Sequence, residues 1–323
     1  MPELKVGVLG LGAMGKNHVR VLSNMDSVSE VKVFDPVLGR GSRFMGLAVE
    51  KTMESFLDSD LDYCVVSTPT ANHESVSLLL AQLRIPALVE KPIAVSAAEG
   101  RRMLDAFSRL QVLGAVGHIE RYNPAAIGLK QRIDEGMLGK IFQVTTTRVG
   151  PFTGRIKDVG VIKDLASHDI HLVGWLTGQG YLSVESRTAS LAEGPHEDSL
   201  LAIGTLTDGT LFSHVVNWVS PAKERRTTVL GENGLMVADT LSGNLFFYEN
   251  GTNKSNWDSL SQFRGTTEGP VHKFELAKEE PLVAEHLAFQ GAVKTGDTSN
   301  IVSLEEALSV IEIADRLIIS GGQ

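Results

Sequence analysis

Three side chains suited to acid–base chemistry lie within one short stretch of the chain, at Asp164, His168 and His171. The apolar spacing of residues 163–173 predicts a helix that continues to Leu176, and residues four apart lie on the same face of a helix. A carboxylate beside an imidazole, whose ordinary pKa is about 6.5, can accept and return a proton near neutral pH. We therefore expect Asp164 and His168 to act in catalysis.

Two other interpretations of these three side chains stay open. Carboxylates and imidazoles also bind metal ions, although one helix rarely supplies a complete ligand set and the sequence shows no obvious second cluster of ligands. The three side chains can also form a solvated polar face of the helix. We expect acid–base catalysis without a metal and keep both alternatives.

A single lysine occupies a position where a cation can assist such chemistry. The tripeptide Glu90-Lys91-Pro92 follows the apolar run Ala87–Val89, which is expected to be a buried strand. Most lysines are solvated surface charges, but Pro92 stiffens this turn, and ligands of parallel sheets collect at the ends of strands. Lys91 can there hydrogen-bond a reacting hydroxyl and stabilise a developing alkoxide.

A glycine-rich turn follows the first apolar run of the chain. Gly10 permits the tight turn out of a strand, Gly12 lets the backbone approach a pyrophosphate, and Gly15 lets the next helix pack closely on the strand. The N-terminus of that helix favours phosphate through its unpaired N–H groups and its dipole. The residues expected to bind a dinucleotide here are Gly10, Gly12, Ala13, Met14 and Gly15.

A second apolar strand, Val31–Phe34, ends in Asp35, which lies twenty residues after Gly15. A carboxylate at this place accepts hydrogen bonds from the adenosine ribose and repels a 2′-phosphate, whereas NADP sites usually carry an arginine there. Lys32 and Arg40 are near in sequence, but neither replaces the acid. The pattern predicts NAD rather than NADP, and a glycine-rich turn of another α/β protein is the alternative.

The elements that must position these residues alternate along the first third of the chain. Apolar strands are expected at 62–67, 86–90 and 112–117, and helices at 72–82 and 96–110. This order predicts a parallel sheet covered by helices on both faces, with ligands at the carboxyl ends of its strands. Two strand ends should therefore contribute further cofactor contacts, namely Ser67, Thr68, Pro69, Asn72, His73, Glu90 and Lys91.

A polar segment after the third of these strands marks a change of domain. We expect a dinucleotide-binding domain over residues 1–120 and a second domain over 121–323, and domain boundaries often line active sites. The segment supplies candidate substrate-binding residues, to which we add Lys163: His118, Glu120, Arg121, Tyr122 and Asn123. The alternative makes Arg121 a structural ion-pair partner and Asn123 the cap of the helix expected at 125–135. A plain helix start, capped by Thr70 or Asn72, is likewise the alternative for residues 68–73.

The rest of the chain is rich in strands. Alternating β-branched residues predict a long strand at 140–149, and six more runs are separated by turns. We expect an α/β fold whose second, α+β domain has a large open, mostly antiparallel sheet, with a subunit interface that includes Trp218 and Phe246. Residues 251–280 read as a long loop, followed by helices at 281–295 and 303–319, of which the last can pack back near the first domain.

Composition excludes several classes of protein. A chain of 323 residues suits two domains, and a net charge of −9 without a block of Lys or Arg argues against nucleic acid as the partner. No apolar run reaches the length of a membrane span and no secretory leader is seen, so the cytoplasm is expected. The single cysteine, Cys64, lies in an apolar run and is expected to be buried and inert.

Four motifs in order resemble those of the glucose–fructose oxidoreductase / inositol dehydrogenase (Gfo/Idh/MocA) family. They are the glycine turn ending in Gly15-Lys16-Asn17-His18, then Thr68-Pro69 with His73, then Glu90-Lys91-Pro92, then Asp164 with His168. The resemblance covers essentially the whole chain. It implies a Rossmann domain followed by an α+β domain whose open sheet forms homodimers or homotetramers.

The resemblance also implies roles for matching residues. Lys91 matches the lysine near the reacting hydroxyl and the nicotinamide, and His168 matches the general base, with Asp164 beside it on the substrate. Which of Lys91 and His168 takes the proton stays open. The segment leading into this helix, residues 158–164, departs from the family's glycine-rich pattern, which affects the expected fine contacts with substrate.

Residues 117–124, Gly-His-Ile-Glu-Arg-Tyr-Asn-Pro, are similar to a segment of family members that oxidise C3 of UDP-N-acetylglucosamine-type sugars. We expect an NAD-dependent sugar or nucleotide-sugar dehydrogenase of this kind, with inositol or glucose-type dehydrogenases as alternatives. A diphosphate would need cations, and the candidates by position are Arg148, Arg155, Lys157 and Lys163. From other classes, a non-catalytic NAD(P)-binding sensor and a metal-dependent hydrolase are the alternatives.

Overall fold

The structure, a computed structural model, describes residues 3–38, 41–152, 159–191, 196–251 and 267–322 of the 323-residue chain. The chain divides into two compact units. Unit 1 combines Met1–Ile119 with Glu280–Glu312, and unit 2 combines Glu120–Glu279 with Ile313–Gln323. Residues 280–312, which the sequence assigned to the second domain, therefore pack with unit 1.

Unit 1 is built on a five-stranded parallel sheet with the strand order β2-β1-β5-β6-β7. Its strands are β1 (Leu4–Leu9), β2 (Val28–Phe34), β5 (Tyr63–Val66), β6 (Ala87–Glu90) and β7 (Gly114–Gly117). Every residue of β5 and β6 is buried, as expected for strands that are covered on both faces. The predicted parallel sheet is confirmed.

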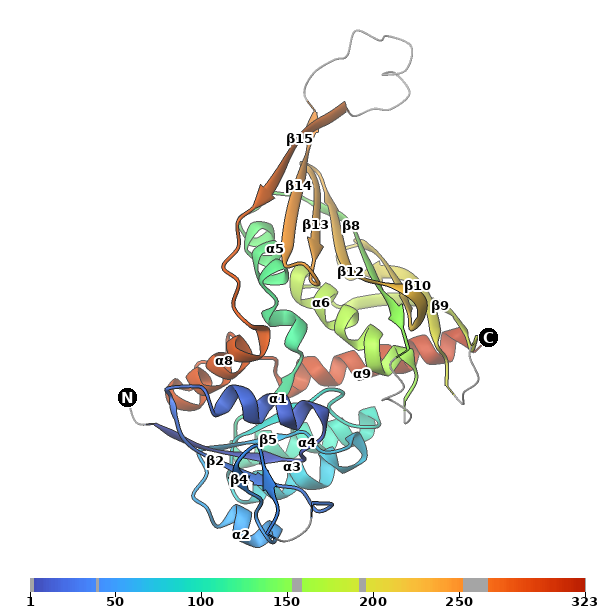
Figure 1. The fold of residues 1–323 in the computed structure, drawn as a ribbon. Coiled ribbons are helices and arrows are strands. Elements are labelled where there is room, and N and C mark those ends of the chain that lie inside the picture. Colours follow the sequence, from blue (N-terminus) through green and yellow to red (C-terminus); the bar gives the residue numbers. More distant parts are fainter. Residues whose placement is uncertain (1–2, 39–40, 153–158, 192–195, 252–266, 323) are drawn as a thin grey trace. The chain divides into compact units, whose positions relative to one another are not determined.

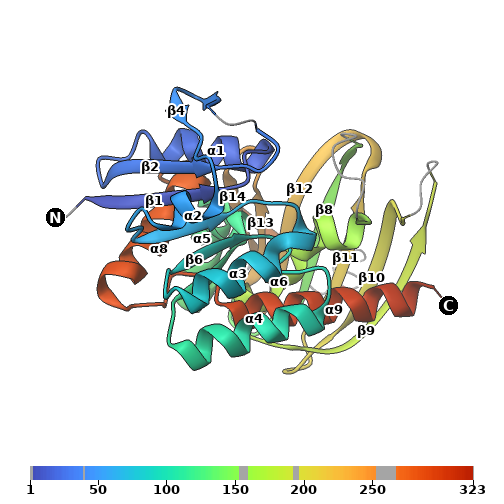
Figure 2. The ribbon, with the colours of Figure 1, turned by 90° about the horizontal axis from the view of Figure 1, so that it is seen from below.

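Helices cover both faces of this sheet (Figures 1 and 2). Two buried clusters divide the strand side chains by alternation. One cluster joins alternate strand residues such as Val6 and Val65 to Val19 of α1 (Ala13–Leu22) and Phe289 of α8 (Pro281–Thr295). The other joins their neighbours to helices α3 (His73–Gln82), α4 (Ala97–Leu110) and the beginning of α9 (Leu304–Gly321).

Unit 1 contains three short elements that the sequence analysis did not predict, β3 (Arg43–Phe44), β4 (Leu47–Ala48) and α2 (Met53–Leu57). Helix α2 begins with a capping box, in which Thr52 accepts from the Ser55 N–H and Ser55 accepts from the Thr52 N–H. Such short elements carry too little periodicity to be predicted from a single sequence. The 3₁₀ turn η1 (Thr70–Asn72) leads directly into α3.

Unit 2 contains an eight-stranded sheet in the order β15-β14-β13-β12-β8-β11-β10-β9. All neighbours are antiparallel except β8 and β11. The strands are β8 (Ile141–Pro151), β9 (Tyr181–Ala189), β10 (Ser199–Leu206), β11 (Leu211–Asn217), β12 (Val219–Gly231), β13 (Gly234–Asp239), β14 (Asn244–Gly251) and β15 (Thr267–Phe274). The mostly antiparallel sheet is confirmed, but the prediction of a continuous loop over 251–280 is wrong, because β15 pairs there with β14.

Helices cover one face of the second sheet (Figure 1). Leu129 of α5 (Pro124–Asp134) and Val173 of α6 (Ser167–Thr177) pack on Val144, Met236 and other strand residues of one buried cluster. The last turns of α9 join the same unit, where Ser186 Oγ donates to the Leu317 carbonyl at 2.6 Å. Trp218 and Phe246, expected at an exposed interface, are half-buried, and Trp218 packs on Phe152.

The turn after β1 generates the first testable prediction. A Cβ on Gly15 would lie 2.0 Å from the Gly10 carbonyl oxygen, so α1 could not keep its place against the turn. We expect Gly15→Ala to destabilise the protein by about 2 kcal/mol or more, as overpacking against backbone does. Thermal unfolding followed by circular dichroism measures it.

Gly12→Ala is the matched control, because a Cβ on Gly12 meets nothing within 4 Å. It should leave the unfolding temperature unchanged. Equal unfolding temperatures for the two variants would contradict the close packing of α1 on this turn.

Candidate active site

The glycine turn of unit 1 is open on one side and closed on the other. Gly10 has a φ of 88° and a Cβ there would lie 2.6 Å from the Ser67 carbonyl oxygen, so the turn needs glycine. Ser67 Oγ donates to the Gly10 carbonyl at 2.8 Å and fixes the turn against the end of β5. Gly12, at the beginning of α1, borders open space, and no side chain caps this helix. The N–H groups of the first turn of α1 are therefore accessible to a phosphate.

Asp35, at the end of β2, holds the same turn through its carboxylate. Its Oδ2 accepts from the Leu11 N–H and its Oδ1 from the Val37 N–H, both at 2.8 Å. A carboxylate can accept about four hydrogen bonds, so capacity remains for two ribose hydroxyls. Thr68, one residue after Ser67, has a buried hydroxyl without a hydrogen-bond partner among the described residues. These residues fit a bound dinucleotide.

His73 connects two strand ends of unit 1 by hydrogen bonds. It is 1% exposed, with Nε2 at 2.9 Å from the Thr68 carbonyl oxygen and Nδ1 at 2.9 Å from that of Pro92. Burial lowers the pKa of His73 and outweighs these two carbonyls, so the neutral ring donates to one of them at a time. The His73 ring thereby joins the turn after β5 to the turn that carries Lys91. Pro69 and Asn72 lie on the same turn with exposed side chains.

A buried hydrogen-bond network supports Lys91 at the end of β6. The Lys91 N–H donates to Glu90 Oε2 at 3.1 Å, and Glu90 Oε1 lies 2.9 Å from His18 Nε2. His18 Nδ1 in turn lies 2.9 Å from His286 Nε2 on α8, so helices from both ends of the chain support this strand end. The Lys91–Pro92 peptide bond is cis, and Lys91 itself is half-buried.

The acid–base pair of unit 2 lies on an interrupted helix. Residues Ile162–Ala166 form a π-helical turn, η3, which contains Asp164, and α6 begins at Ser167 directly before His168. The predicted helix is therefore confirmed from Ser167 onward, and a π turn replaces the regular α-helix that was expected around Asp164. Both side chains are nearly buried, at 8% and 9% exposed. π turns of this kind are frequent at functional sites.

Glu197 holds the beginning of this π turn, and the sequence analysis did not identify it. Its carbonyl accepts from the Val161 N–H at 2.9 Å and its Oε1 from the Ile162 N–H at 3.1 Å. A Cβ on Gly160 would lie 2.0 Å from that carboxylate, so the glycine makes room for it. A carboxylate at a helix start also interacts favourably with the helix dipole.

Arg148 forms a buried ion cluster next to this helix. Its Nε donates to Asp169 Oδ1 at 2.8 Å and its NH1 to Glu120 Oε1 at 3.1 Å, and it is 3% exposed. Burial lowers the pKa of Arg148, but the two carboxylates outweigh it and leave that pKa raised. Burial raises the pKa of Asp169 despite the arginine. The guanidinium binds these carboxylates, which corrects its place among the candidate diphosphate ligands.

The remaining predicted substrate residues are engaged within their own units. Asn123 caps α5, accepting from the Ala125 N–H at 3.0 Å, which confirms the alternative expected for it. Arg121 lies over the Trp175 ring at 5.2 Å, and Lys163 pairs with Asp315 at 2.9 Å. His118 and Tyr122 are buried. Arg155 and Lys157 lie outside the described residues, and substrate binding by this set stays a prediction.

Long-range partners are the residues that sequence reasoning missed. His18 was visible in the motif after Gly15, but its partner His286 is separated from it by 268 residues. Glu285, the neighbour of His286, gives no local signal because it lies in an ordinary helical pattern. In the part of the chain that the structure describes, no three His, Cys, Asp or Glu side chains are grouped to hold a metal ion. No described helix is long and apolar enough for a membrane span.

Comparison with known proteins identifies the family. A model described as "Oxidoreductase family, NAD-binding Rossmann fold" matches residues 4–118, and a model of the GFO/IDH/MocA C-terminal domain matches residues 127–237. The chain belongs to the GFO/IDH/MocA oxidoreductase family. It is therefore an NAD(P)-dependent oxidoreductase that acts on CH–OH groups, with NAD as the cofactor that its Rossmann unit binds.

Relatives within the GFO/IDH/MocA family are similar over most of the chain. UDP-N-acetylglucosamine 3-dehydrogenase from Acidithiobacillus ferrooxidans is 26% identical over 298 residues, 91% of this chain and 90% of that protein. An inositol 2-dehydrogenase from Streptomyces avermitilis is 31% identical over 190 residues, 56% of this chain and 55% of that protein.

Solved structures show the same fold. That of the Acidithiobacillus ferrooxidans enzyme has a TM-score of 0.85 at 23% identity, covering 99% of this chain and 98% of that one. GenD2 from gentamicin A biosynthesis, solved in complex with NAD, has a TM-score of 0.82 at 24% identity, covering 100% of this chain and 95% of that one.

The buried ion cluster generates the second testable prediction. We expect Arg148→Met to destabilise the protein by about 3 kcal/mol, because it leaves the buried Asp169 and the partly buried Glu120 without their ion-pair partner. Chemical denaturation measures the change in the free energy of unfolding.

Arg101→Met is the matched control, because Arg101 pairs with Glu312 at 2.8 Å while about half of each side chain is exposed. Exposed pairs contribute at most about 1 kcal/mol. A loss for Arg148→Met as small as the loss for the control would show that the buried cluster does not stabilise unit 2.

Proposed function

We propose that this protein is an NAD-dependent dehydrogenase that oxidises C3 of a UDP-N-acetylglucosamine-type sugar to a ketone. The observation that carries the proposal is the similarity to UDP-N-acetylglucosamine 3-dehydrogenase over 91% of this chain. The segment at residues 117–124, which resembles that subclass, is the part of the sequence that points to this substrate class.

In the proposed mechanism each predicted catalytic residue has one task. NAD, when bound, supplies the acceptor of the hydride that leaves the sugar carbon. His168 takes the hydroxyl proton, Asp164 holds the substrate hydroxyls beside it, and Lys91 stabilises the negative charge that develops on the oxygen. Glu90 positions Lys91 by accepting from its backbone N–H at 3.1 Å. Gly10, Gly12, Asp35 and Thr68 would hold the cofactor.

One second substrate class has an observation in its favour. Inositol 2-dehydrogenases are similar to this chain, in one case at 31% identity over 190 residues. Such an enzyme would use the same three residues on a cyclic polyol and would need no site for a diphosphate.

The assay that separates these substrates measures NADH by its absorbance. NAD is supplied with UDP-N-acetylglucosamine, its uronic acid, glucose, glucose 6-phosphate or myo-inositol, and an aminotransferase with glutamate removes the keto sugar. We expect NADH with the UDP-sugars. NADH only with inositol or a free sugar would overturn the proposed substrate and keep the reaction type.

Lys91 generates the third testable prediction. We expect Lys91→Met to lower kcat by about 10²- to 10⁴-fold, because the developing alkoxide loses its cation, while the affinity for NAD changes little. Steady-state kinetics and NAD titration measure the two quantities separately.

Lys294→Met, at the exposed end of α8, is the control and should keep wild-type kcat. Retention of most turnover by Lys91→Met with NAD still bound would remove the catalytic role from this lysine.

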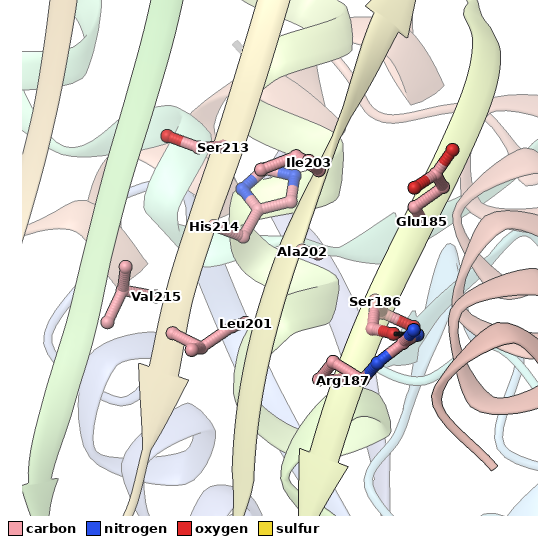
Figure 3. Close-up of a pocket in the computed structure, with 9 residues that line it drawn as sticks. All are labelled: Glu185, Ser186, Arg187, Leu201, Ala202, Ile203, Ser213, His214 and Val215. Carbon is pink, nitrogen blue, oxygen red and sulfur yellow. Dashed lines mark hydrogen bonds between the residues drawn. The ribbon is translucent and has the colours of Figure 1, made fainter. Parts of the chain in front are cut away.

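We also propose that the sheet of unit 2 forms a homodimer or homotetramer. A pocket of about 450 Å³ lies on three neighbouring strands, β9, β10 and β11, and Figure 3 shows the residues that line it. Leu201 and Ile203 of β10 are 57% and 59% exposed, although apolar patches of a monomer are usually small. The residues that line the pocket are Glu185, Ser186, Arg187, Leu201, Ala202, Ile203, Ser213, His214 and Val215.

The exposed strand residues generate the fourth testable prediction. We expect the double variant Leu201→Lys and Ile203→Lys to shift the protein to a smaller assembly by light scattering, because buried lysines would lie unpaired in an interface. The double variant Gln131→Lys and Glu135→Lys, exposed at the end of α5, is the control. An unchanged mass for the first variant would place the interface elsewhere.

A further inference from the structure

Glu285 of α8 is a buried carboxyl that the proposed mechanism does not use. Its residue is 1% exposed, and neither of its oxygens has a hydrogen-bond partner among the described residues. An isolated carboxylate is costly to bury, so a group in this setting favours its neutral, protonated form.

A second buried carboxyl, Glu90, lies close to Glu285. A Cβ built on Gly117 would lie 3.5 Å from Glu285 Oε1 and 3.6 Å from Glu90 Oε1, so both carboxyls border the space that this glycine leaves. Two carboxyls that share a buried space do not both ionise easily, and one of them keeps a proton.

Hydrogen bonds distinguish the two carboxyls. Glu90 receives the Lys91 N–H on Oε2 at 3.1 Å and the His18 ring on Oε1 at 2.9 Å, whereas Glu285 receives no such donor from the described residues. Donors stabilise the ionised form of a carboxyl. Glu285 is therefore the member of the pair that keeps the proton more readily.

A chain of donors behind His18 supports this assignment. His18 Nδ1 lies 2.9 Å from His286 Nε2, and His286 Nδ1 lies 3.2 Å from the Tyr63 hydroxyl, which accepts from Gln290 at 3.1 Å. With Tyr63 as donor to His286, the donors of this chain point from Tyr63 through His286 and His18 toward Glu90. Burial lowers the pKa of His286 well below its usual value, which agrees with a neutral ring. Burial, together with Glu90, raises the pKa of Glu285 well above its usual value.

This pair lies near the glycine turn of the cofactor site. Val66 is the register partner of Val89, so Ser67 and Glu90 follow at the same level of the sheet, and Ser67 contacts the Gly10 turn. Glu90 also accepts from the N–H of Lys91 at 3.1 Å, and Lys91 is the residue proposed to lie beside the nicotinamide, so the charge of the oxidised ring would act on the pair from on the order of 10 Å. A unit charge at about 10 Å shifts a pKa by about one unit at an effective dielectric constant of about 20.

We propose that the protonation of Glu285 is linked to the oxidation state of the cofactor. A larger fraction of Glu285 is protonated when the reduced cofactor is bound. Oxidised nicotinamide is positively charged and favours the Glu285 carboxylate, and its reduction removes that charge. Oxidation of CH–OH releases one hydride and one proton; the hydride neutralises the charge of the nicotinamide, and the Glu285 carboxylate takes up part of an equivalent proton, which lowers the negative charge of the pair. The inference depends on cofactor binding and not on which sugar is oxidised.

Several other titratable groups surround the pair and must be separated from it. His73 of α3 is close enough for Glu90 to raise its pKa, and burial opposes that effect. The groups that face the pair or adjoin it in sequence are His18, Tyr63, His73, Lys91, His118 and His286.

Calorimetric binding of NAD⁺ and NADH without substrate generates the fifth testable prediction. Titrations in buffers of different ionisation enthalpy, between pH 5.5 and 9, give the protons taken up with each cofactor. For a shift of about one unit we expect NADH to take up about half a proton more than NAD⁺ at the pH of greatest difference. The ratio of Kd for NADH to Kd for NAD⁺ should rise about tenfold from low to high pH.

Three variants decide whether Glu285 is the group that binds this proton. Glu285→Gln should abolish the difference between the cofactors, and Glu305→Gln, on an exposed turn of α9, should keep it. Gly117→Ala places a methyl group at van der Waals distance between the carboxyls and should move the pH of greatest difference upward. Equal proton uptake for both cofactors in the wild type, or a difference that persists in Glu285→Gln, would overturn the proposal.

Discussion

A buried carboxylate needs hydrogen-bond donors, and this requirement governs how the end of β6 is built. Glu90 takes one donor from the backbone of Lys91 and another from His18, which is backed by His286 and Tyr63. Because these partners come from α1, β5 and α8, the place of Lys91 depends on residues from both ends of the chain. Helix α8 therefore belongs to the Rossmann unit through this network as well as by covering its apolar face.

In unit 2 an arginine, and not a histidine, provides the donors that a buried carboxylate needs. Arg148 of β8 binds Asp169, the residue after His168, and Glu120, at the beginning of the polar segment. The cluster thereby fixes the start of α6 and that segment to one strand. Glu197 holds the preceding π turn by its backbone N–H groups. Residues that the sequence suggested for substrate are thus surrounded by buried pairs, which limit how far they can move.

Local signals carried the sequence predictions that succeeded. The glycine turn, Asp35 and the alternating strands and helices of unit 1 depend on neighbours a few residues apart, so their spacing shows in the sequence. Arg148 was placed among diphosphate ligands because its partners, 21 and 28 residues away, are invisible to such reasoning. Strand β15 lies beyond a polar stretch without alternation, and the π turn leaves the spacing of Asp164 and His168 unchanged. Pairing and register of this kind are decided by tertiary contacts.

The measurement that tests the central claim most directly is the transfer of deuterium from the sugar to the cofactor. UDP-N-acetylglucosamine labelled with deuterium at C3 is incubated with the protein and NAD, an aminotransferase removes the keto sugar, and the NADH formed is analysed by mass spectrometry. The account predicts that this NADH carries the deuterium and forms more slowly than from the unlabelled sugar. Unlabelled NADH formed at an undiminished rate would contradict oxidation at C3.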